Sequence, residues 1–364
     1  MKRWPSRRSL LITGLLAALI IVATGLIFQK PLMNALMPHM VRAAMDRRNV
    51  HFADGLYAGL CGTGSPMPDA HRAGPCIAVL AGDHLFIVDA GEGSTKNITL
   101  MKLPIRKAEA VLLTHFHSDH IADLGEMELQ RWVGGSRTTP INVIGPPGVE
   151  RVVEGFNLAY QLDTGYRVAH HGPGTVPPAG AGGMARPFQL SDAPNASVVV
   201  YDWDGVKITA FKVDHRPVVP AVGYRVDYKG RSLVISGDTV YSESLLEHAK
   251  GADVLFHEAL NTAMVRMMND NAAETGSPSL GKVTRDIPGY HSTPEDAAKI
   301  AHAANVKRLI YYHIIPPFPS IIFKKSFLGD AKSYYNGPIT IGEDGMLVFL
   351  PPNSARIEIK KVLR

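Results

Sequence analysis

The stretch Thr114–His120, with the sequence THFHSDH, constrains the fold more than any other part of the chain. It follows a short apolar run that is typical of a buried strand and precedes a segment with helical character. Residues two apart in an extended chain point to the same side, so His115 and His117 can bind one metal ion. Asp119 and His120 lie where the chain turns into the helix and can face a second ion. Imidazole nitrogen and carboxylate oxygen together suit Zn²⁺.

Further residues of the metal-binding type follow other apolar runs. These runs end at His215, at Asp238, at His257 and Glu258, and at His313. Each position repeats the arrangement seen at His115, since a polar residue stands at the carboxyl end of a probable strand. Ligands collected from the ends of adjacent strands form a rigid site at one edge of a sheet. The sequence therefore predicts one metal centre built from several distant segments.

The N-terminal segment predicts membrane attachment. No charged residue occurs from Ser9 to Gln29, which is close to the roughly 20 residues that span a bilayer. Basic residues before this run place the N-terminus in the cytoplasm. We expect a transmembrane signal anchor at 1–28, a connector at 29–52 and a hydrolase domain at 53–364. The chain would lie in a bacterial inner membrane with its catalytic domain in the periplasm, or be secreted to the periplasm if the segment is cleaved.

Charge and cysteine content narrow the function classes. The formal net charge is +5, and the four cations that precede Gln29 supply most of it. The remaining chain is nearly neutral, so the high pI does not indicate a nucleic-acid surface. The two cysteines, Cys61 and Cys76, flank a loop between two expected strands. We interpret them as small buried core residues, with a disulfide as the alternative in an oxidising compartment.

Strand and helix signals alternate along the rest of the chain and suggest two sheets with helices outside them. We expect a helix near 149–162, a long surface loop at 172–195 and a final hairpin formed by 339–341 and 346–350. The segment 260–290 predicts either an apolar lid that includes Tyr290 or a surface helix and loop.

Six motifs together resemble the metallo-β-lactamase superfamily, in the branch shared by ribonuclease Z and the metallo-β-lactamase-type arylsulfatases. They are THFHSDH at 114–120, VDHRPVVPAVGYR at 213–225, SGDT at 236–239, HEA at 257–259, HSTPEDAA at 291–298 and YYHI at 311–314. The resemblance covers roughly 55–350. It implies an α/β fold, a four-layer αββα sandwich, which here follows the N-terminal transmembrane helix.

The resemblance also implies two Zn²⁺ ions, although Fe or Mn would suit the same ligands. His115, His117 and His215 would hold one ion, Asp119, His120 and His313 the other, and Asp238 would bridge them. The expected catalytic residues are Asp119 and His291. His291 lies outside the ligand set and would protonate the leaving oxygen or hold an anionic oxygen. Asp89, His257 and Glu258 would orient the ligands; capping or core hydrogen bonding is their alternative role.

Ribonuclease Z has a basic arm that grips tRNA, whereas the loop 172–195 contains Arg186 and no Lys. We therefore expect an exported, membrane-anchored, arylsulfatase-like hydrolase of sulfate esters or phosphodiesters, acting on a small anionic ester and not on nucleic acid. The alternatives are a carboxyl-ester or lactone hydrolase, a ribonuclease Z-like phosphodiesterase with tRNA 3′ processing disfavoured, or a tethered protein with a purely structural metal site. Arg72 is a candidate partner for an anionic substrate. The oligomeric state is open, and a homodimer is compatible with the sequence.

Overall fold

The computed structural model describes residues 7–46, 50–274, 276–318 and 320–363. It divides into two units, one that ends at His51 and one that spans Phe52–Arg364. The first unit contains helix α1 (Arg7–Asp46), which includes Pro31 and Pro38. The helix therefore continues past the boundary expected at residue 28 and takes up most of the predicted connector.

Helix α1 is the apolar segment from which a membrane span was expected. Among the described residues, no single helix has both the length and the apolar character needed to cross a bilayer alone. Helix α1 contains two consecutive parts, Leu11–Leu26 and Phe28–Arg42, with a bend of 54° between them. Only the two parts together have the length and apolar character of a membrane span. The expected single transmembrane helix is thus not found in that form.

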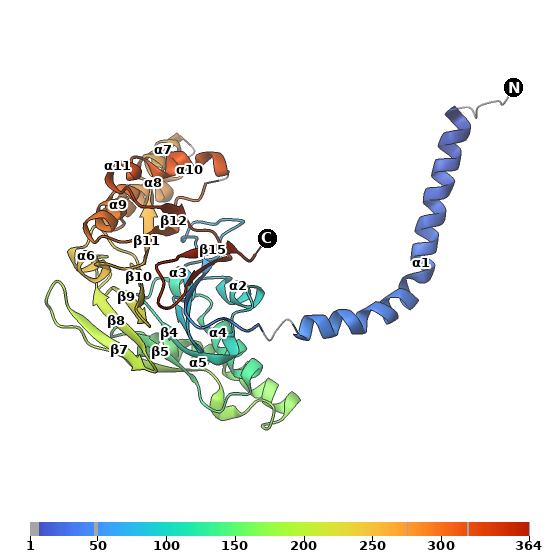
Figure 1. Cartoon of the computed structure of the whole chain (residues 1–364), viewed down its shortest axis with the longest axis horizontal. Coiled ribbons are helices and arrows are strands. Elements are labelled where there is room, and N and C mark those ends of the chain that lie inside the picture. The colour runs from blue at the N-terminus through green and yellow to red at the C-terminus, as the bar shows by residue number, and fades with distance from the viewer. Residues whose placement is uncertain (1–6, 47–49, 275, 319, 364) are drawn as a thin grey trace. The chain divides into compact units, whose positions relative to one another are not determined.

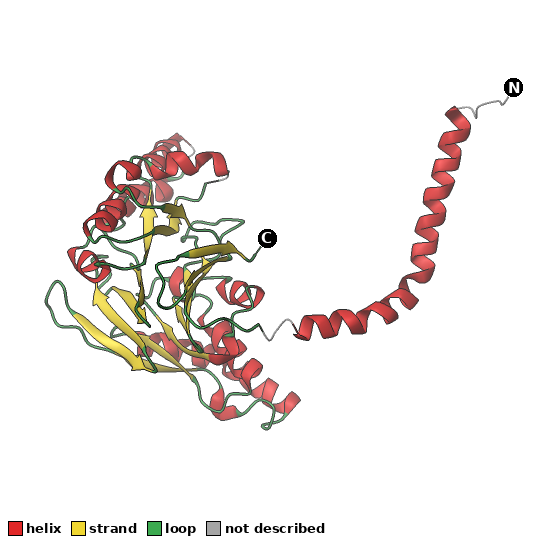
Figure 2. Ribbon diagram, in the orientation of Figure 1, coloured by secondary structure: helices red, strands yellow, loops and turns green. Residues whose placement is uncertain are grey.

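The second unit contains two sheets (Figures 1 and 2). The first sheet has eight strands, and the last four of them are parallel to one another. In spatial order the strands are β15 (Glu358–Lys361), β14 (Met346–Leu350), β1 (Leu56–Gly62), β2 (Cys76–Ala81), β3 (His84–Val88), β4 (Ala108–Leu112), β5 (Ile141–Gly145) and β6 (Gly183–Pro187).

The second sheet has seven strands, and its first four are parallel. In spatial order they are β13 (Ile339–Ile341), β12 (Leu309–Ile315), β11 (Val254–Leu260), β10 (Arg231–Ile235), β9 (Val222–Tyr228), β8 (Val206–Lys212) and β7 (Ser197–Trp203). Parallel strands end at the same edge of a sheet. The residues that follow β10, β11 and β12 are therefore brought together, as are those that follow β3 and β4.

Alternating side chains of the strands build separate cores on the two faces of each sheet. In β11, Val254 and Phe256 face the core between the two sheets, whereas Leu255 and Ala259 face the helices. Strands buried on both faces explain why the sequence shows continuous apolar runs instead of alternation. Helices cover the outer faces, so the expected α/β sandwich with two sheets is confirmed (Figure 2).

The helices associated with the first sheet are α2 (Ser94–Leu100), α3 (Ser118–Ile121), α4 (Leu124–Gly135) and α5 (Val149–His171). Those that follow strands of the second sheet are α6 (Glu243–Ala249), α7 (Thr262–Glu274), α8 (Pro278–Asp286), α9 (Pro294–Ala303), α10 (Lys324–Leu328) and α11 (Ala331–Tyr334). Short 3₁₀ turns lie at Ile105–Lys107, Pro178–Gly180, Ile287–Gly289 and Ile321–Phe323.

Three local expectations are wrong. Helix α5 extends to His171, well beyond residue 162. The predicted loop 172–195 contains strand β6, which pairs with β5 at the sheet edge. The predicted final hairpin does not form, because β13 pairs with β12 in one sheet and β14 pairs with β1 in the other. Short-range sequence patterns carry no information about such long-range partners.

Cys61 and Cys76 form a disulfide. The interpretation of the two cysteines as unbridged core residues is therefore wrong, and the alternative is correct. The two cysteines lie on the adjacent strands β1 and β2, with their Cα atoms 5.0 Å apart. This separation lies in the range that a disulfide needs. Both side chains are buried in the core between the first sheet and its helices.

Candidate metal centre

The first group of nitrogen ligands gathers beyond the end of strand β4. His115 Nε2 lies 3.0 Å from His117 Nδ1, and His215 Nε2 lies 3.3 Å from the same atom. His215 comes from the second sheet, where it follows strand β8 and forms an isolated β-bridge to Val218. His115 and His215 are buried, whereas His117 is exposed. The group therefore opens to solvent at His117.

The second group is formed by Asp119, His120 and His313. Asp119 Oδ2 lies 3.5 Å from His120 Nε2 and 3.3 Å from His313 Nε2. The pairing of β11 with β12 skips His313, which has a positive φ of 47°. Such a bulge redirects a side chain out of the regular alternation of the strand. The local backbone thus aims His313 at residues that come from the other sheet.

Asp238 lies between the two groups. Its Oδ2 atom is 3.4 Å from both His120 Nε2 and His313 Nε2, and 3.8 Å from His115 Nε2. The preceding residue, Gly237, has a φ of 62°, and a Cβ added there would approach the carbonyl oxygen of Val222 to 2.6 Å. Only glycine fits this turn, which presents Asp238 at the end of β10.

The donor set suits bound cations. The Nε2 atom of His120 and the Oδ1 atom of Asp238 are buried, and neither has a hydrogen-bond partner among the described residues. An unpaired buried polar atom is costly unless a further group satisfies it. Four ligand atoms of His115, His117, His215 and Asp238 lie within 4.8 Å of one another, as do three of Asp119, His120 and His313. The site therefore fits divalent metal, and its mixed nitrogen and oxygen donors suit zinc.

The carboxylates of Asp89, Asp119 and Asp238 stabilise positive charge within the metal centre. Burial lowers the pKa of His115 well below its ordinary value, so its imidazole is a neutral ligand. Burial alone would lower the pKa of His120 too, but Asp238, Asp119 and Asp89 raise that pKa well above its ordinary value. The neighbouring histidines hold the pKa of Asp238 well below its ordinary value, despite its burial. The centre thus keeps its acids ionised, as cation binding requires.

Second contacts fix the orientation of the histidines. His120 Nδ1 donates to Asp89 Oδ2 at 2.8 Å, which leaves Nε2 free to face Asp238. Asp89 also accepts hydrogen bonds from the amide and hydroxyl of Thr114. His215 Nδ1 donates to the carbonyl oxygen of Tyr290 at 2.8 Å. Asp89 therefore contacts a proposed metal ligand, as expected from the sequence. The contact of His215 with Tyr290 could not be predicted in this way, because a backbone carbonyl group is present in every residue.

Glu258 contacts His291 and not the six metal-type ligands around Asp238. His291 Nδ1 donates to Glu258 Oε1 at 3.0 Å, and the same oxygen accepts from the amide of Ser292. His291 Nδ1 also lies 4.0 Å from Asp238 Oδ2. Because Glu258 occupies Nδ1, the Nε2 atom of His291 remains available to a substrate. The expectation that Glu258 orients metal ligands is corrected accordingly.

His257 does not serve the centre. Neighbouring residues of a strand face opposite sides, so His257 points toward the helices while Glu258 points toward the metal site. Its Nδ1 donates to the carbonyl oxygen of Glu258, and its pKa is lowered by burial. The expectation that it orients ligands is wrong, because the alternation of β11 turns its ring away.

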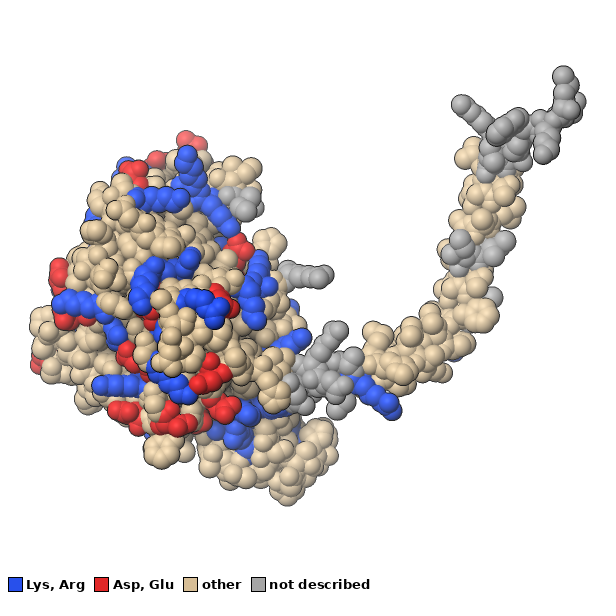
Figure 3. Space-filling view, in the orientation of Figure 1, with Lys and Arg blue, Asp and Glu red and all other residues tan. Residues whose placement is uncertain are grey.

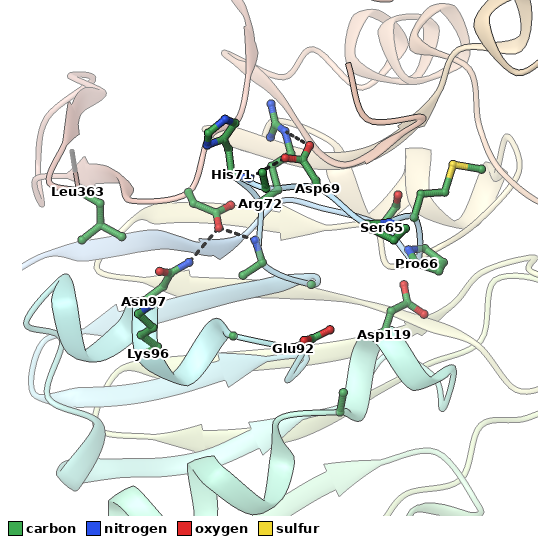
Figure 4. A pocket seen from close by; sticks show the side chains of 18 of the residues that line it. Ser65, Pro66, Asp69, His71, Arg72, Glu92, Lys96, Asn97, Asp119 and Leu363 are labelled. Atoms are coloured by element: carbon green, nitrogen blue, oxygen red, sulfur yellow. Dashed lines mark hydrogen bonds and ion pairs between the residues drawn. The ribbon is translucent and has the colours of Figure 1, made fainter. Parts of the chain in front are cut away.

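A pocket of about 1070 Å³ adjoins the centre (Figure 4). Asp119 lies at one end of it, opposite Ser65 and Pro66, and Leu363 lies at the other. Arg72, the expected partner of a substrate anion, already makes hydrogen bonds within the protein. Its guanidinium donates to Thr63 Oγ1 at 2.6 Å and to the carbonyl oxygen of Gly342 at 2.7 Å.

Comparison with known proteins identifies the family. A family model described as "Beta-lactamase superfamily domain" matches residues 84–314. Ribonuclease Z of Mycobacterium sp. (strain KMS) is 39% identical over 259 residues, which cover 71% of this chain and 84% of the relative. Ribonuclease Z of Mycobacterium bovis (strain BCG / Pasteur 1173P2) is 36% identical over 288 residues, which cover 78% of this chain and 95% of the relative.

Solved structures share the fold. The metallo-β-lactamase fold protein YhfI of Bacillus subtilis aligns with a TM-score of 0.56 and 20% identity over 82% of this chain and all of its own. The short form of human tRNase Z aligns with a TM-score of 0.56 and 21% identity over 81% of this chain and 99% of its own. At these identities the likeness supports the architecture alone.

These relatives correct the function expected from the sequence. The curated relatives are named Ribonuclease Z, so the expected arylsulfatase-like activity is wrong, as is the expected small anionic ester substrate with no nucleic acid. That expectation depended on a missing basic arm at 172–195, a segment that folds partly as β6. Family and donor set together make the protein a metal-dependent hydrolase of ester bonds. The chain belongs to the metallo-β-lactamase superfamily, in its ribonuclease Z branch.

Proposed function

We propose that this protein hydrolyses phosphodiester bonds in RNA with two divalent cations, preferably zinc. The observation that carries the proposal is the position of Asp238 Oδ2, within 3.9 Å of four histidine Nε2 atoms that belong to two clusters. A carboxylate oxygen shared in this way suits a bridging ligand. The relatives named Ribonuclease Z support RNA as the substrate class.

In this proposal each ion has its own nitrogen ligands. His115, His117 and His215 would hold one ion, Asp119, His120 and His313 would hold the other, and Asp238 would serve both. Asp89 keeps His120 in the tautomer that presents Nε2. When bound, such a pair of cations lowers the pKa of water toward neutrality and stabilises charge on the substrate oxygens.

His291 is the proposed proton donor. Hydrolysis adds hydroxide to phosphorus and breaks the bond to the leaving oxygen, which then needs a proton. Burial alone would lower the pKa of His291, but Glu258, and after it Asp238, raise that pKa above its ordinary value. The hydrogen bond to Glu258 fixes Nδ1, so the proton is delivered from Nε2. Asp119, at the partly exposed mouth of the centre, borders the pocket through which the substrate enters.

The test is cleavage of a labelled single-stranded RNA by the second unit, Phe52–Arg364, which we call the catalytic unit, after its metal content has been measured. We expect cleavage by the wild type and a loss of at least a hundredfold in Asp238→Asn, with Asp202→Asn as a surface control. An aryl sulfate is assayed in parallel. Turnover of the sulfate but not of RNA by the fully metallated enzyme would refute the proposal.

We also propose that the N-terminal segment anchors the chain in a bacterial inner membrane and that the catalytic unit lies in the periplasm. The uncharged run 9–29 and the basic residues before it support this orientation. The Cys61–Cys76 disulfide supports an oxidising compartment. Protease added to spheroplasts should digest the catalytic unit; complete protection of it until the membrane is lysed would place it in the cytoplasm.

A further inference from the structure

Tyr290 is built rigidly into the wall of the metal centre. It follows the 3₁₀ turn Ile287–Gly289 and directly precedes His291. Its amide donates to the carbonyl oxygen of Ile287, and its own carbonyl oxygen accepts from His215 Nδ1 at 2.8 Å. Its backbone is thus held at both the amide and the carbonyl group. The position of the residue is fixed without a bound substrate.

The ring of Tyr290 lies against two site histidines. Its centroid is 5.4 Å from that of His215, at an interplanar angle of 78°, and 5.0 Å from that of His291, at 49°. The ring also packs, together with Met67, on a small apolar cluster made by Leu260, Val265, Ile287 and Ile315. Met67 in turn lines the pocket that Asp119 borders. Tyr290 therefore stands where the metal centre meets this apolar cluster.

The side chain of Tyr290 is only partly buried, so part of its ring is accessible to a ligand. Catalysis by the residues around Asp238 makes no use of an aromatic ring at this place. The phenol oxygen has no hydrogen-bond partner among the described residues, so the ring is not placed to satisfy a buried polar group. A fixed, partly exposed aromatic ring beside a phosphodiester site is suited to stack on a planar base.

The surface charge of the catalytic unit suggests that RNA binding needs contacts other than ion pairs, such as base stacking. On the face of the catalytic unit drawn in Figure 3, Lys and Arg side chains are interspersed with Asp and Glu. The formal charge of the chain outside its N-terminal segment is also close to zero. Attraction of the RNA backbone by a broad basic surface is therefore weak on this face. Stacking provides affinity that does not depend on charge.

We propose that Tyr290 stacks on a nucleobase that flanks the scissile phosphate and so selects nucleotide substrates. This inference rests on the proposed hydrolysis of RNA. Base stacking on an aromatic side chain is strong enough to change the specificity constant by roughly tenfold or more. The stack orients the nucleotide so that its phosphate faces the metal centre.

The experiment combines protein variants with modified RNA. Tyr290→Phe keeps the ring, Tyr290→Leu keeps an apolar side chain without a ring, and Tyr334→Leu removes an exposed tyrosine that contacts Lys299. Each protein is loaded with zinc, its metal content is measured, and kcat/KM is determined on two oligonucleotides. One carries normal bases beside the cleaved bond, and the other carries abasic riboses at both flanking positions.

We expect Tyr290→Leu to lose roughly tenfold in kcat/KM on the normal RNA, mostly through KM, and almost nothing on the abasic RNA. Tyr290→Phe and Tyr334→Leu should match the wild type on both. Equal losses on both oligonucleotides, or loss of zinc from Tyr290→Leu, would show a structural role and overturn the inference alone. Failure of the wild type to cleave normal RNA would refute the proposed function and the inference with it.

Discussion

Glu128 provides a quantitative test of the packing of α4 against the first sheet. This carboxyl group lies on α4 and is 2% exposed, and neither of its oxygens has a hydrogen-bond partner among the described residues. Burial raises its pKa to about 8, from an ordinary value of 4.5. A Cβ at Gly183, the first residue of β6, would come within 2.3 Å of Glu128 Oε1, so the acid is packed directly against that edge strand.

The raised pKa has a defined effect on stability. The contribution of Glu128 is fully present below pH 4.5 and is lost as the pH rises through 8, because ionisation occurs more readily in the unfolded chain. One pKa unit corresponds to about 1.36 kcal/mol. Between pH 6 and pH 8, linkage gives a loss of about 2 kcal/mol in the free energy of unfolding from this one group.

Glu128→Gln removes the titration while nearly keeping the volume of the side chain. Urea unfolding of the catalytic unit at pH 6 and pH 8 should show that the variant loses about 2 kcal/mol less than the wild type over this interval. Glu154→Gln, on the exposed surface of α5, is the matched control and should follow the wild type. If Glu128→Gln and the wild type have the same pH dependence, the carboxyl group is not held in its neutral form and the reasoning fails.

Three further predictions concern the site and its support. Glu258→Gln should move the alkaline limit of kcat to lower pH, because the carboxylate raises the pKa of His291; an unchanged pH–rate profile on RNA would contradict this. Asp89→Asn should weaken zinc binding roughly 10- to 100-fold in a competition titration, since Asp89 orients His120; wild-type affinity would argue against that role. Replacing Cys61 and Cys76 by serine opens a loop with a sequence separation of 15 and should cost about 3 kcal/mol in urea unfolding, whereas equal stability would show that the disulfide is energetically neutral.

Much of the centre was predictable because its residues follow apolar runs. His115, His215, Asp238 and His313 each come at or near the carboxyl end of a strand, and parallel strands place their ends at one edge. The apolar runs are visible in the sequence because the strands are buried on both faces. Residue type and position along the chain are therefore enough to indicate a common site.

Other features depend on geometry that residue type does not encode. The positive φ of His313 arises from a bulge in the pairing of β11 with β12. The opposite directions of His257 and Glu258 depend on which face of β11 meets the first sheet and which meets the helices. Strand β6 forms in a segment rich in glycine and proline because β5 offers it an open edge. The choice of RNA over a small ester came from the relatives and not from a local pattern.

Metal titration tests most directly whether hydrolysis of RNA depends on two cations that share Asp238 as a ligand. The catalytic unit is stripped by a chelator, and Zn²⁺ is then added back in fractions of an equivalent while cleavage of labelled RNA is followed. We expect no cleavage by the stripped protein and full recovery at two equivalents per chain, with no recovery for Asp238→Asn. Cleavage that survives complete removal of metal, or full recovery at one equivalent, would contradict it.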